Sequence, residues 1–201
     1  LVALAVGFRL GRFQTHIFQN RGEAKLSRAL QERFLAPDYH LLNHVTLPIG
    51  NETTQIDHIL VSRFGLFVIE TKDYNGWIFA SAAEDYWKQV LFQTRFKFQN
   101  PLRQNYRHVC AVRELLEFLP ADVIRPAVVF MGAAEFKSNV PLGVYTLTDF
   151  LAFVGNHREE LISLNRVQFC VGRLETTRLA ISKKTDVEHV QRLRRRFGDD
   201  Q

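Results

Sequence analysis

Two short apolar runs on either side of a glycine constrain the fold of this chain more than any other feature. Residues 54–62 and 65–72 are rich in Ile, Val, Leu and Phe, and an Arg-Phe-Gly break separates them. Apolar runs of this length around a turn signal are typical of a β-hairpin. The segment therefore predicts two antiparallel strands joined by a tight turn.

Charged side chains of this hairpin converge near the end away from the turn. With the turn centred on Arg63 and Phe64, Asp57 falls opposite Glu70, and Lys72 lies on the same face because side chains alternate along a strand. Directly opposed residues have Cβ atoms about 4.5–5.5 Å apart, so like charges there repel each other. Two carboxylates held this close indicate a bound cation.

A divalent metal ion explains these residue types. Hard divalent ions such as Mg²⁺ prefer oxygen ligands such as the carboxylates of Asp57 and Glu70. Such an ion polarises a phosphodiester and acidifies a bound water molecule. The Lys72 ammonium would hold that water or stabilise the charge that develops on the phosphate. His58 lies on the opposite strand face, so we expect a structural or supporting role for it.

The Glu-x-Lys tripeptide alone is a weak signal. It occurs three times, at residues 23–25, 70–72 and 135–137. Only the second copy ends an apolar strand and faces an Asp across a hairpin. The alternative, a solvated Glu/Lys pair at the end of an edge strand, stays open because the sequence does not fix the register.

Further elements are predicted along the chain from apolar periodicity, Pro and Gly. A helix begins near Gly22 and stops at Pro37, and a polar loop at 48–53 precedes the hairpin. The other expected strands are 39–47, 77–80, 86–92 and 126–131, and the other expected helices are 101–119, 146–157, 159–171 and one from 185.

Polar residues on two of these helices are also candidates. Glu23 sits at one end of the apolar stripe of its helix, where a carboxylate needs a partner. The alternative is an ordinary first-turn Glu favoured by the helix dipole. On the helix 101–119, Gln104 and His108 are four residues apart and share a face.

The charge of the chain favours a polyanionic partner. The 201 residues carry a formal net charge of +5, which suits nucleic acid or an anionic membrane surface, with solubility alone as the alternative. Arg194, Arg195 and Arg196, with Arg192 nearby, form a basic run, and the three consecutive arginines are a candidate DNA contact. Cys110 and Cys170 lack metal-ligand spacing and are expected to be buried thiols.

The first twenty residues are treated as a separate segment. Residues 1–8 are apolar and basic residues follow, but eight residues are too few to cross a bilayer, which takes about 20. The segment 1–20 is interpreted as the end of a truncated membrane anchor, or else as an amphipathic first helix. Residues 21–201 are predicted to form one domain.

Several short motifs resemble the nuclease-related domain (NERD) family in order and spacing. The resemblance covers about residues 22–119 and rests on Gly22-Glu23, Gln55-Ile56-Asp57-His58-Ile59, Gly65-Leu66-Phe67-Val68-Ile69-Glu70-Thr71-Lys72, Gly76, Trp87 and Asn100-Pro101-Leu102-Arg103-Gln104-Asn105. The family is similar to the PD-(D/E)xK nuclease superfamily. The resemblance thus implies an α/β fold with a restriction-endonuclease-like core, a central mixed β-sheet flanked by helices.

The resemblance also implies a function and a site. Asp57 and Glu70, with Glu23, would bind Mg²⁺ or Mn²⁺, Lys72 would be the catalytic lysine, and Gln104 would orient the substrate or Lys72. The expected activity is metal-dependent hydrolysis of DNA. The alternative is a non-cleaving DNA-binding or membrane-associated scaffold that retains the fold. Many family members are bacterial and carry an N-terminal membrane segment, so we expect a cytoplasmic protein, free or anchored to the inner membrane through its N-terminus.

Overall fold

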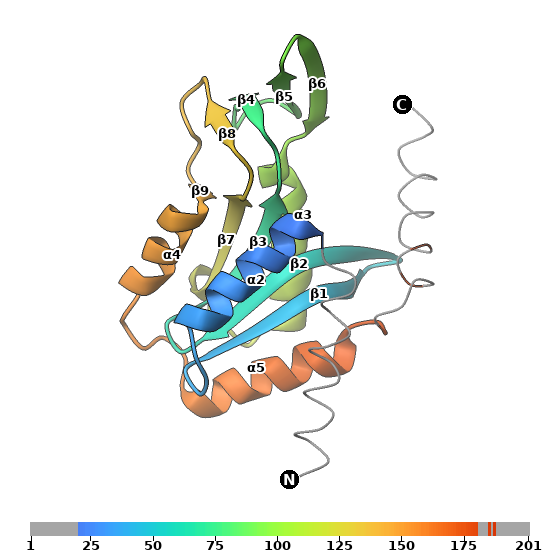
Figure 1. The fold of residues 1–201 in the computed structure, drawn as a ribbon. Coiled ribbons are helices and arrows are strands. Elements are labelled where there is room, and N and C mark those ends of the chain that lie inside the picture. The colour runs from blue at the N-terminus through green and yellow to red at the C-terminus, as the bar shows by residue number, and fades with distance from the viewer. Residues whose placement is uncertain (1–19, 181–184, 186, 188–201) are drawn as a thin grey trace.

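Two mixed β-sheets with flanking helices make up the computed structural model, which describes residues 20–180 together with residues 185 and 187 (Figure 1). The expected α/β fold with a central mixed sheet is confirmed. The elements in chain order are α2 (Arg21–Arg33), β1 (Tyr39–Ile49), β2 (Glu52–Ser62), β3 (Gly65–Lys72), β4 (Gly76–Phe79), β5 (Tyr86–Leu91), β6 (Thr94–Gln99), α3 (Pro101–Leu115), η1 (Ala121–Val123), β7 (Ile124–Phe130), β8 (Ala134–Phe136), β9 (Val144–Thr146), α4 (Leu147–Asn156) and α5 (Leu164–Thr177).

The larger sheet has the strand order β1-β2-β3-β7-β9. The first three strands are antiparallel, whereas β7 and β9 run parallel to β3. The hairpin pairs Ser62 with Gly65 and continues to His58 opposite Ile69, which is the register expected from the turn. Gly65 has φ of 144°, and a Cβ there would collide with the guanidinium of Arg125, so the turn requires glycine.

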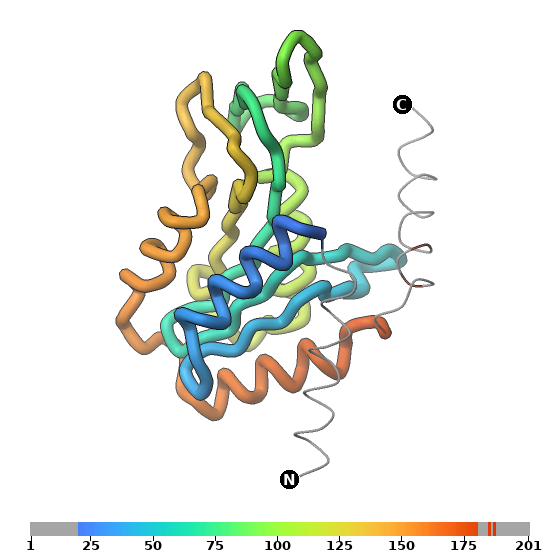
Figure 2. The backbone as a smooth tube through the Cα atoms, in the orientation of Figure 1, coloured from blue at the N-terminus to red at the C-terminus, as the bar shows by residue number. Residues whose placement is uncertain are grey.

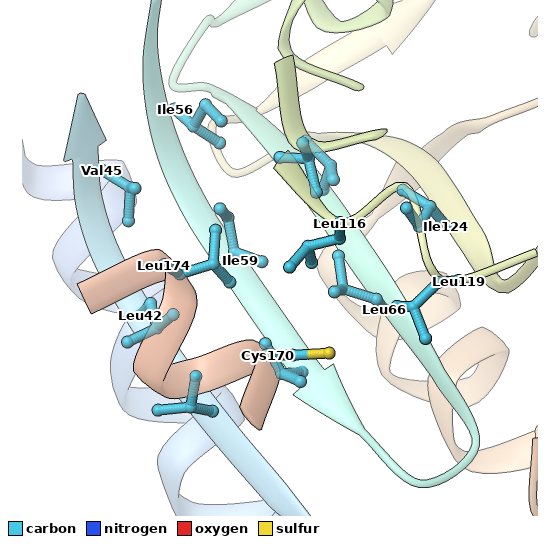
Figure 3. Close-up of a cluster of buried hydrophobic side chains, with 14 of the residues drawn as sticks. Leu42, Val45, Ile56, Ile59, Leu66, Leu116, Leu119, Ile124, Cys170 and Leu174 are labelled. Atoms are coloured by element: carbon cyan, nitrogen blue, oxygen red, sulfur yellow. The ribbon is translucent and has the colours of Figure 1, made fainter. Parts of the chain in front are cut away.

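Strand β3 is apolar on both faces because helices cover both faces of the larger sheet. Leu66 and Val68 belong to a core that α3 and α5 complete, and Figure 3 shows part of this cluster around Ile59, Leu116 and Cys170. The other face of β3 packs against α2 and α4. A strand buried on both sides holds its polar residues at its ends, where Glu70 and Lys72 lie.

The smaller sheet has the order β6-β5-β4-β8 and projects beyond the ends of β3 and β7 (Figure 2). One face is apolar: Ile78 and Trp87 are buried and join Phe130 at the end of β7. The indole of Trp87 stacks on the Phe130 ring with 6.3 Å between centroids. The chain enters this sheet directly from β3.

Some boundaries differ from the sequence predictions. The expected loop 48–53 shrinks to Gly50 and Asn51, because β1 and β2 form one long hairpin. The helix expected at 159–171 is instead Leu164–Thr177, since Ser163 caps its start and the backbone N–H groups of Leu161 and Ile162 both donate to the Arg63 carbonyl. Strands β6, β8 and β9 were not expected.

Several sequence predictions fall outside the described residues. They are the segment 1–8, the helix beginning at 185 beyond residues 185 and 187, and the basic run Arg192, Arg194, Arg195 and Arg196. Among the described helices, none combines the length and the apolar composition that a membrane crossing requires.

Candidate active site

The candidate site lies where β3 leaves the larger sheet. Two helix starts meet the strand end here: α2 brings Glu23 and α3 brings Gln104. Asn100 fixes the start of α3, because its side-chain oxygen accepts from Leu102 N at 2.9 Å while its amide group donates to the Glu84 carbonyl at 2.7 Å. This cap directs one face of α3 against β3.

Both carboxylate oxygens of Glu70 are hydrogen-bonded. Lys72 Nζ donates to Oε1 at 2.7 Å, and His108 Nε2 lies 3.0 Å from Oε2. Because a carboxylate only accepts, Nε2 carries a proton, and on the other side of the ring Nδ1 lies 2.6 Å from the Thr54 hydroxyl. Burial raises the pKa of Glu70, but His108 and Lys72 outweigh it, and the net pKa is lowered.

Lys72 is held between two oxygen acceptors. Its Nζ donates to Glu70 Oε1 and, at 3.0 Å, to Gln104 Oε1, which uses two of its three N–H donors. Burial works to lower the pKa of this ammonium, but the Glu70 carboxylate more than offsets it and raises the pKa above its ordinary value. Lys72 is therefore a fixed positive charge.

Asp57 lies on the neighbouring strand, half-buried. The backbone pairing of the hairpin ends at His58 opposite Ile69, so the structure does not extend the ladder to the expected pair of Asp57 and Glu70. Its Oδ2 accepts from Thr71 N at 2.7 Å. Burial raises the pKa of Asp57 well above its ordinary value, and the charges of Glu70 and Glu23 raise it further.

Glu23 has two partners of different kinds. It is the third residue of α2, and Asn20 both caps its backbone N–H at 3.0 Å and donates to its Oε1, an arrangement that resembles a capping box. Its side chain is buried. Burial, followed by the charge of Glu70, raises the pKa of Glu23 to about 7. Glu23 thus fits both interpretations of the sequence: it is a first-turn glutamate of α2, and its charge interacts with Glu70 at the candidate site.

Contacts join four of the five predicted site residues into one cluster. Glu70, Lys72 and Gln104 form a chain of hydrogen bonds, Asp57 is anchored to the backbone of β3, and Glu23 acts through its charge. His58 is buried on the other face, as the strand alternation predicts. Its Nδ1 bonds Asn43 Oδ1 at 2.8 Å, and burial lowers its pKa to about 3.

The residues fit a divalent cation by charge and donor type. Across residues 20–180, 185 and 187, no three His, Cys, Asp or Glu side chains are grouped tightly enough to hold a metal ion as they stand. The pKa values of Asp57 and Glu23 are nevertheless raised in part by neighbouring carboxylates, and a cation would relieve that repulsion. The carboxylates of Asp57, Glu70 and Glu23 offer oxygen donors, which suit Mg²⁺ or Mn²⁺.

The sequence did not predict the hydrogen bonds of His108 with Glu70 and Thr54. It also did not predict that Asn105 fixes α3 against the larger sheet. Asn105 is fully buried, and its amide group donates to the carbonyls of Val68 and Ala127, both at 3.0 Å. Asn105 lies between Gln104 and His108 in α3, and its two hydrogen bonds hold the helix against β3 and β7. The spacing of Gln104 and His108 on one helix face was the signal available in the sequence.

Replacing Glu23 by Gln is expected to stabilise the metal-free protein most above pH 7. The folded-state pKa of about 7 exceeds the ordinary 4.5, so the folded state holds this proton more tightly than the unfolded chain does. That stabilisation is full below pH 4.5 and is lost as the pH rises through 7. Gln imitates the protonated form, and the gain should be of the order of 1–3 kcal/mol at about pH 8.

Melting curves in EDTA across this pH range measure the effect. Glu32→Gln, at an exposed position of the same helix, is the matched control and should change little. A loss of stability in Glu23→Gln at every pH would leave only the capping contact with Asn20 as the role of Glu23.

Comparisons with known proteins place this geometry in context. A family model described as "Nuclease-related domain" matches residues 19–131. An uncharacterized protein of Bacillus anthracis is 39% identical over 105 residues, which are 51% of this chain and 50% of that relative. The match therefore spans about half the length of the relative. No solved structure matches the chain.

Proposed function

The chain belongs to the nuclease-related domain family, and from this premise we propose that it is a metal-dependent nuclease that hydrolyses DNA phosphodiester bonds. One observation carries the proposal. A half-buried, charged Lys72 is fixed between Glu70 and Gln104, and Asp57 on the neighbouring strand binds the backbone of Thr71. A protein that only binds DNA has no need of opposed carboxylates beside a phosphate.

Asp57 and Glu70 would hold Mg²⁺ or Mn²⁺, with Glu23 as the third carboxylate. When bound, the ion would neutralise charge on the scissile phosphate and acidify the attacking water. The raised pKa values of Asp57 and Glu23 mean that protons leave these groups when the ion binds. Metal binding is therefore favoured by rising pH.

Lys72 acts in this proposal as a cation and hydrogen-bond donor rather than as a base. Its raised pKa keeps it protonated near neutral pH, so it has no lone pair to accept a proton from water. Two N–H groups are fixed by Glu70 and Gln104, which leaves the third for the attacking water or the phosphate. Gln104 positions the ammonium, and His108 positions the Glu70 carboxylate.

A non-cleaving DNA-binding scaffold is the second candidate, and one observation favours it. Both oxygens of Glu70 are already hydrogen-bonded by Lys72 and His108, so the carboxylate is neutralised without a metal ion. A site preserved only for structure would keep these contacts. The two functions differ in what divalent ions do to DNA.

Incubation of the purified protein with circular and linear DNA distinguishes the two candidates. We expect cleavage with Mg²⁺ or Mn²⁺ and intact DNA with EDTA. Asp57→Asn is the site variant, and Asp149→Asn, an exposed acid in the first turn of α4, is the matched control that should still cleave. Retarded but intact DNA under every metal condition would instead support the scaffold.

A further inference from the structure

The outer face of the smaller sheet carries aromatic rings in contact with water. Trp77 and Phe79 on β4 are 49% and 41% exposed, and Tyr86 on β5 is 60% exposed. Their neighbours Ile78 and Trp87 point to the opposite, buried face because side chains alternate along a strand. These three rings are therefore not part of the core, and exposed apolar groups gathered on one surface indicate an interaction site.

Cations occupy the same face in register with the rings. Across the three neighbouring strands, Phe79 pairs with Lys88 and Lys88 with Lys97. In the next outward-facing row, Trp77 pairs with Val90 and Val90 with Arg95. Neighbouring strands lie about 4.8 Å apart, so each cation is within reach of a ring or of the next cation.

The positive charge of this face is largely uncompensated. Within the described part of the chain, Lys88, Arg95 and Lys97 form no ion pair, and all three are exposed. Glu135 pairs with Lys137, whose ammonium lies 4.9 Å from the Trp77 ring centroid. The face thus combines cations with aromatic rings, one ring already in a cation–π contact.

The outer face is also tied closely to the candidate active site. Trp77 follows Lys72 by five residues, so the two are separated by no more than about 18 Å. Asn75 holds the connection: its side-chain oxygen accepts from Ala133 N and its carbonyl from the Gln89 amide, both at 2.7 Å. A strand of DNA crosses this separation in about five phosphates.

We infer that the outer face of the smaller sheet binds unpaired nucleotides of a DNA strand that enters the candidate active site. Trp77, Phe79 and Tyr86 stack on bases, while Lys88, Arg95 and Lys97 contact phosphates. This combination of a cationic surface with stacking rings is how single-stranded nucleic acid is bound without sequence preference. The choice of DNA among polyanions rests on the proposed nuclease function.

Base stacking favours an unpaired strand over a duplex. In a duplex the faces of the bases are covered by their neighbours, so only the cations of this surface have a partner. In an unpaired strand the rings and the cations are both used. The expected ligand class is therefore single-stranded DNA or a frayed or overhanging end.

Fluorescence anisotropy in EDTA tests the inference without any cleavage. The probes are a labelled thymidine homopolymer, a duplex of equal length and an abasic strand of equal length. Trp77→Ala with Phe79→Ala should weaken binding of the homopolymer about 30-fold or more, since each stacked base contributes at least about 1 kcal/mol. Duplex and abasic strand should change by less than about threefold, because neither offers a base face to these rings.

Matched controls come from the other end of the molecule. Phe118→Ala with Phe169→Ala removes an exposed, edge-to-face aromatic pair and should leave homopolymer binding unchanged. Lys88→Gln with Lys97→Gln should reduce the slope of log affinity against log salt by about 1.4 on single strands. Arg166→Gln with Arg173→Gln, on α5, makes the same charge change and should leave the slope unaltered.

Two results would overturn the inference. One is unchanged homopolymer affinity in a folded Trp77/Phe79 variant, or in the Lys88/Lys97 variant if the first does not fold. The other is binding to anionic lipid vesicles that depends on Trp77 while the homopolymer does not bind. These binding measurements use EDTA and therefore do not depend on cleavage. If the protein binds the strand through this face but does not cleave DNA in the assay with Mg²⁺ or Mn²⁺, only the nuclease proposal is refuted.

Discussion

Lys72→Met is expected to lower the rate of DNA cleavage by about 10²–10⁴-fold while DNA binding stays close to that of the wild type. Methionine retains much of the side-chain volume but removes the ammonium that Glu70 Oε1 and Gln104 Oε1 hold in place. The substitution slows the chemical step rather than DNA binding, because additional charge develops on the phosphate only during that step. Single-turnover cleavage with saturating Mn²⁺ measures it.

Lys25→Met provides the matched control for this experiment. Lys25 completes another Glu-x-Lys tripeptide, but it is exposed on α2. We expect the control to cut at nearly the wild-type rate. Wild-type cleavage by Lys72→Met would show that the lysine only balances the charge of Glu70, and the role of cation in the reaction would have to be assigned elsewhere.

Neutralising the two opposed carboxylates should affect the metal-free protein in opposite directions. Asp57→Asn is expected to leave stability equal or increased, because the Asp57 pKa is raised by burial and by two other carboxylates. Glu70→Gln should cost about 1–3 kcal/mol, because it deprives Lys72 and His108 of a charged acceptor in a buried place. Mutual repulsion of the two carboxylates, taken alone, would give the same outcome for both variants.

The pH dependence of the two variants follows from the signs of the pKa shifts. A raised pKa, as for Asp57, stabilises the folded state below the unfolded-state value, and that contribution is lost as the pH rises through the folded-state value, so Asp57→Asn gains most above that value. A lowered pKa, as for Glu70, stabilises the folded state above the ordinary pKa of 4.5, and this contribution is lost as the pH falls through the folded-state pKa. The cost of Glu70→Gln should therefore vanish in acid.

Thermal melts with EDTA and with a titration of Mn²⁺ measure both effects. Either substitution should abolish cleavage and most of the stabilisation that Mn²⁺ gives the wild type, since a ligand stabilises only the state that binds it. Should both variants melt well below the wild type and still respond fully to Mn²⁺, the carboxylates are structural and the metal site is not here.

The hairpin and its charged residues were predictable from the sequence because local rules determine them. The turn at Gly65 gives the expected register from Ser62 to His58, and the alternation of side chains places Glu70 and Lys72 on one face of β3. The capped starts of α3 and α4 were predictable for the same reason, since Asn100 and Thr146 are local signals.

Contacts between distant segments were not predictable in this way. The hydrogen bonds of His108 to Glu70 and Thr54 depend on how closely α3 approaches the sheet, which no local pattern records. Strand β6 alternates Arg95 and Lys97 with Phe96 and Phe98. Because nearly all of its residues are exposed, it lacks the apolar run from which the other strands were predicted. Residues 159–163 were expected to begin a helix, but the backbone N–H groups of Leu161 and Ile162 instead donate to the Arg63 carbonyl in the hairpin turn.

Helix α5 covers an apolar surface of the β1–β2 hairpin, and this determines how much of the chain must be kept in a fusion protein. The family match ends at residue 131, yet Leu42 and Ile59 are covered by Cys170 and Leu174 of α5. A fragment cut at the end of the match would leave this apolar surface of the hairpin in water, although every residue of the candidate active site would be present. The smallest portion of this chain suited to transplantation into a fusion protein thus extends through α5, well past the boundary that sequence similarity suggests.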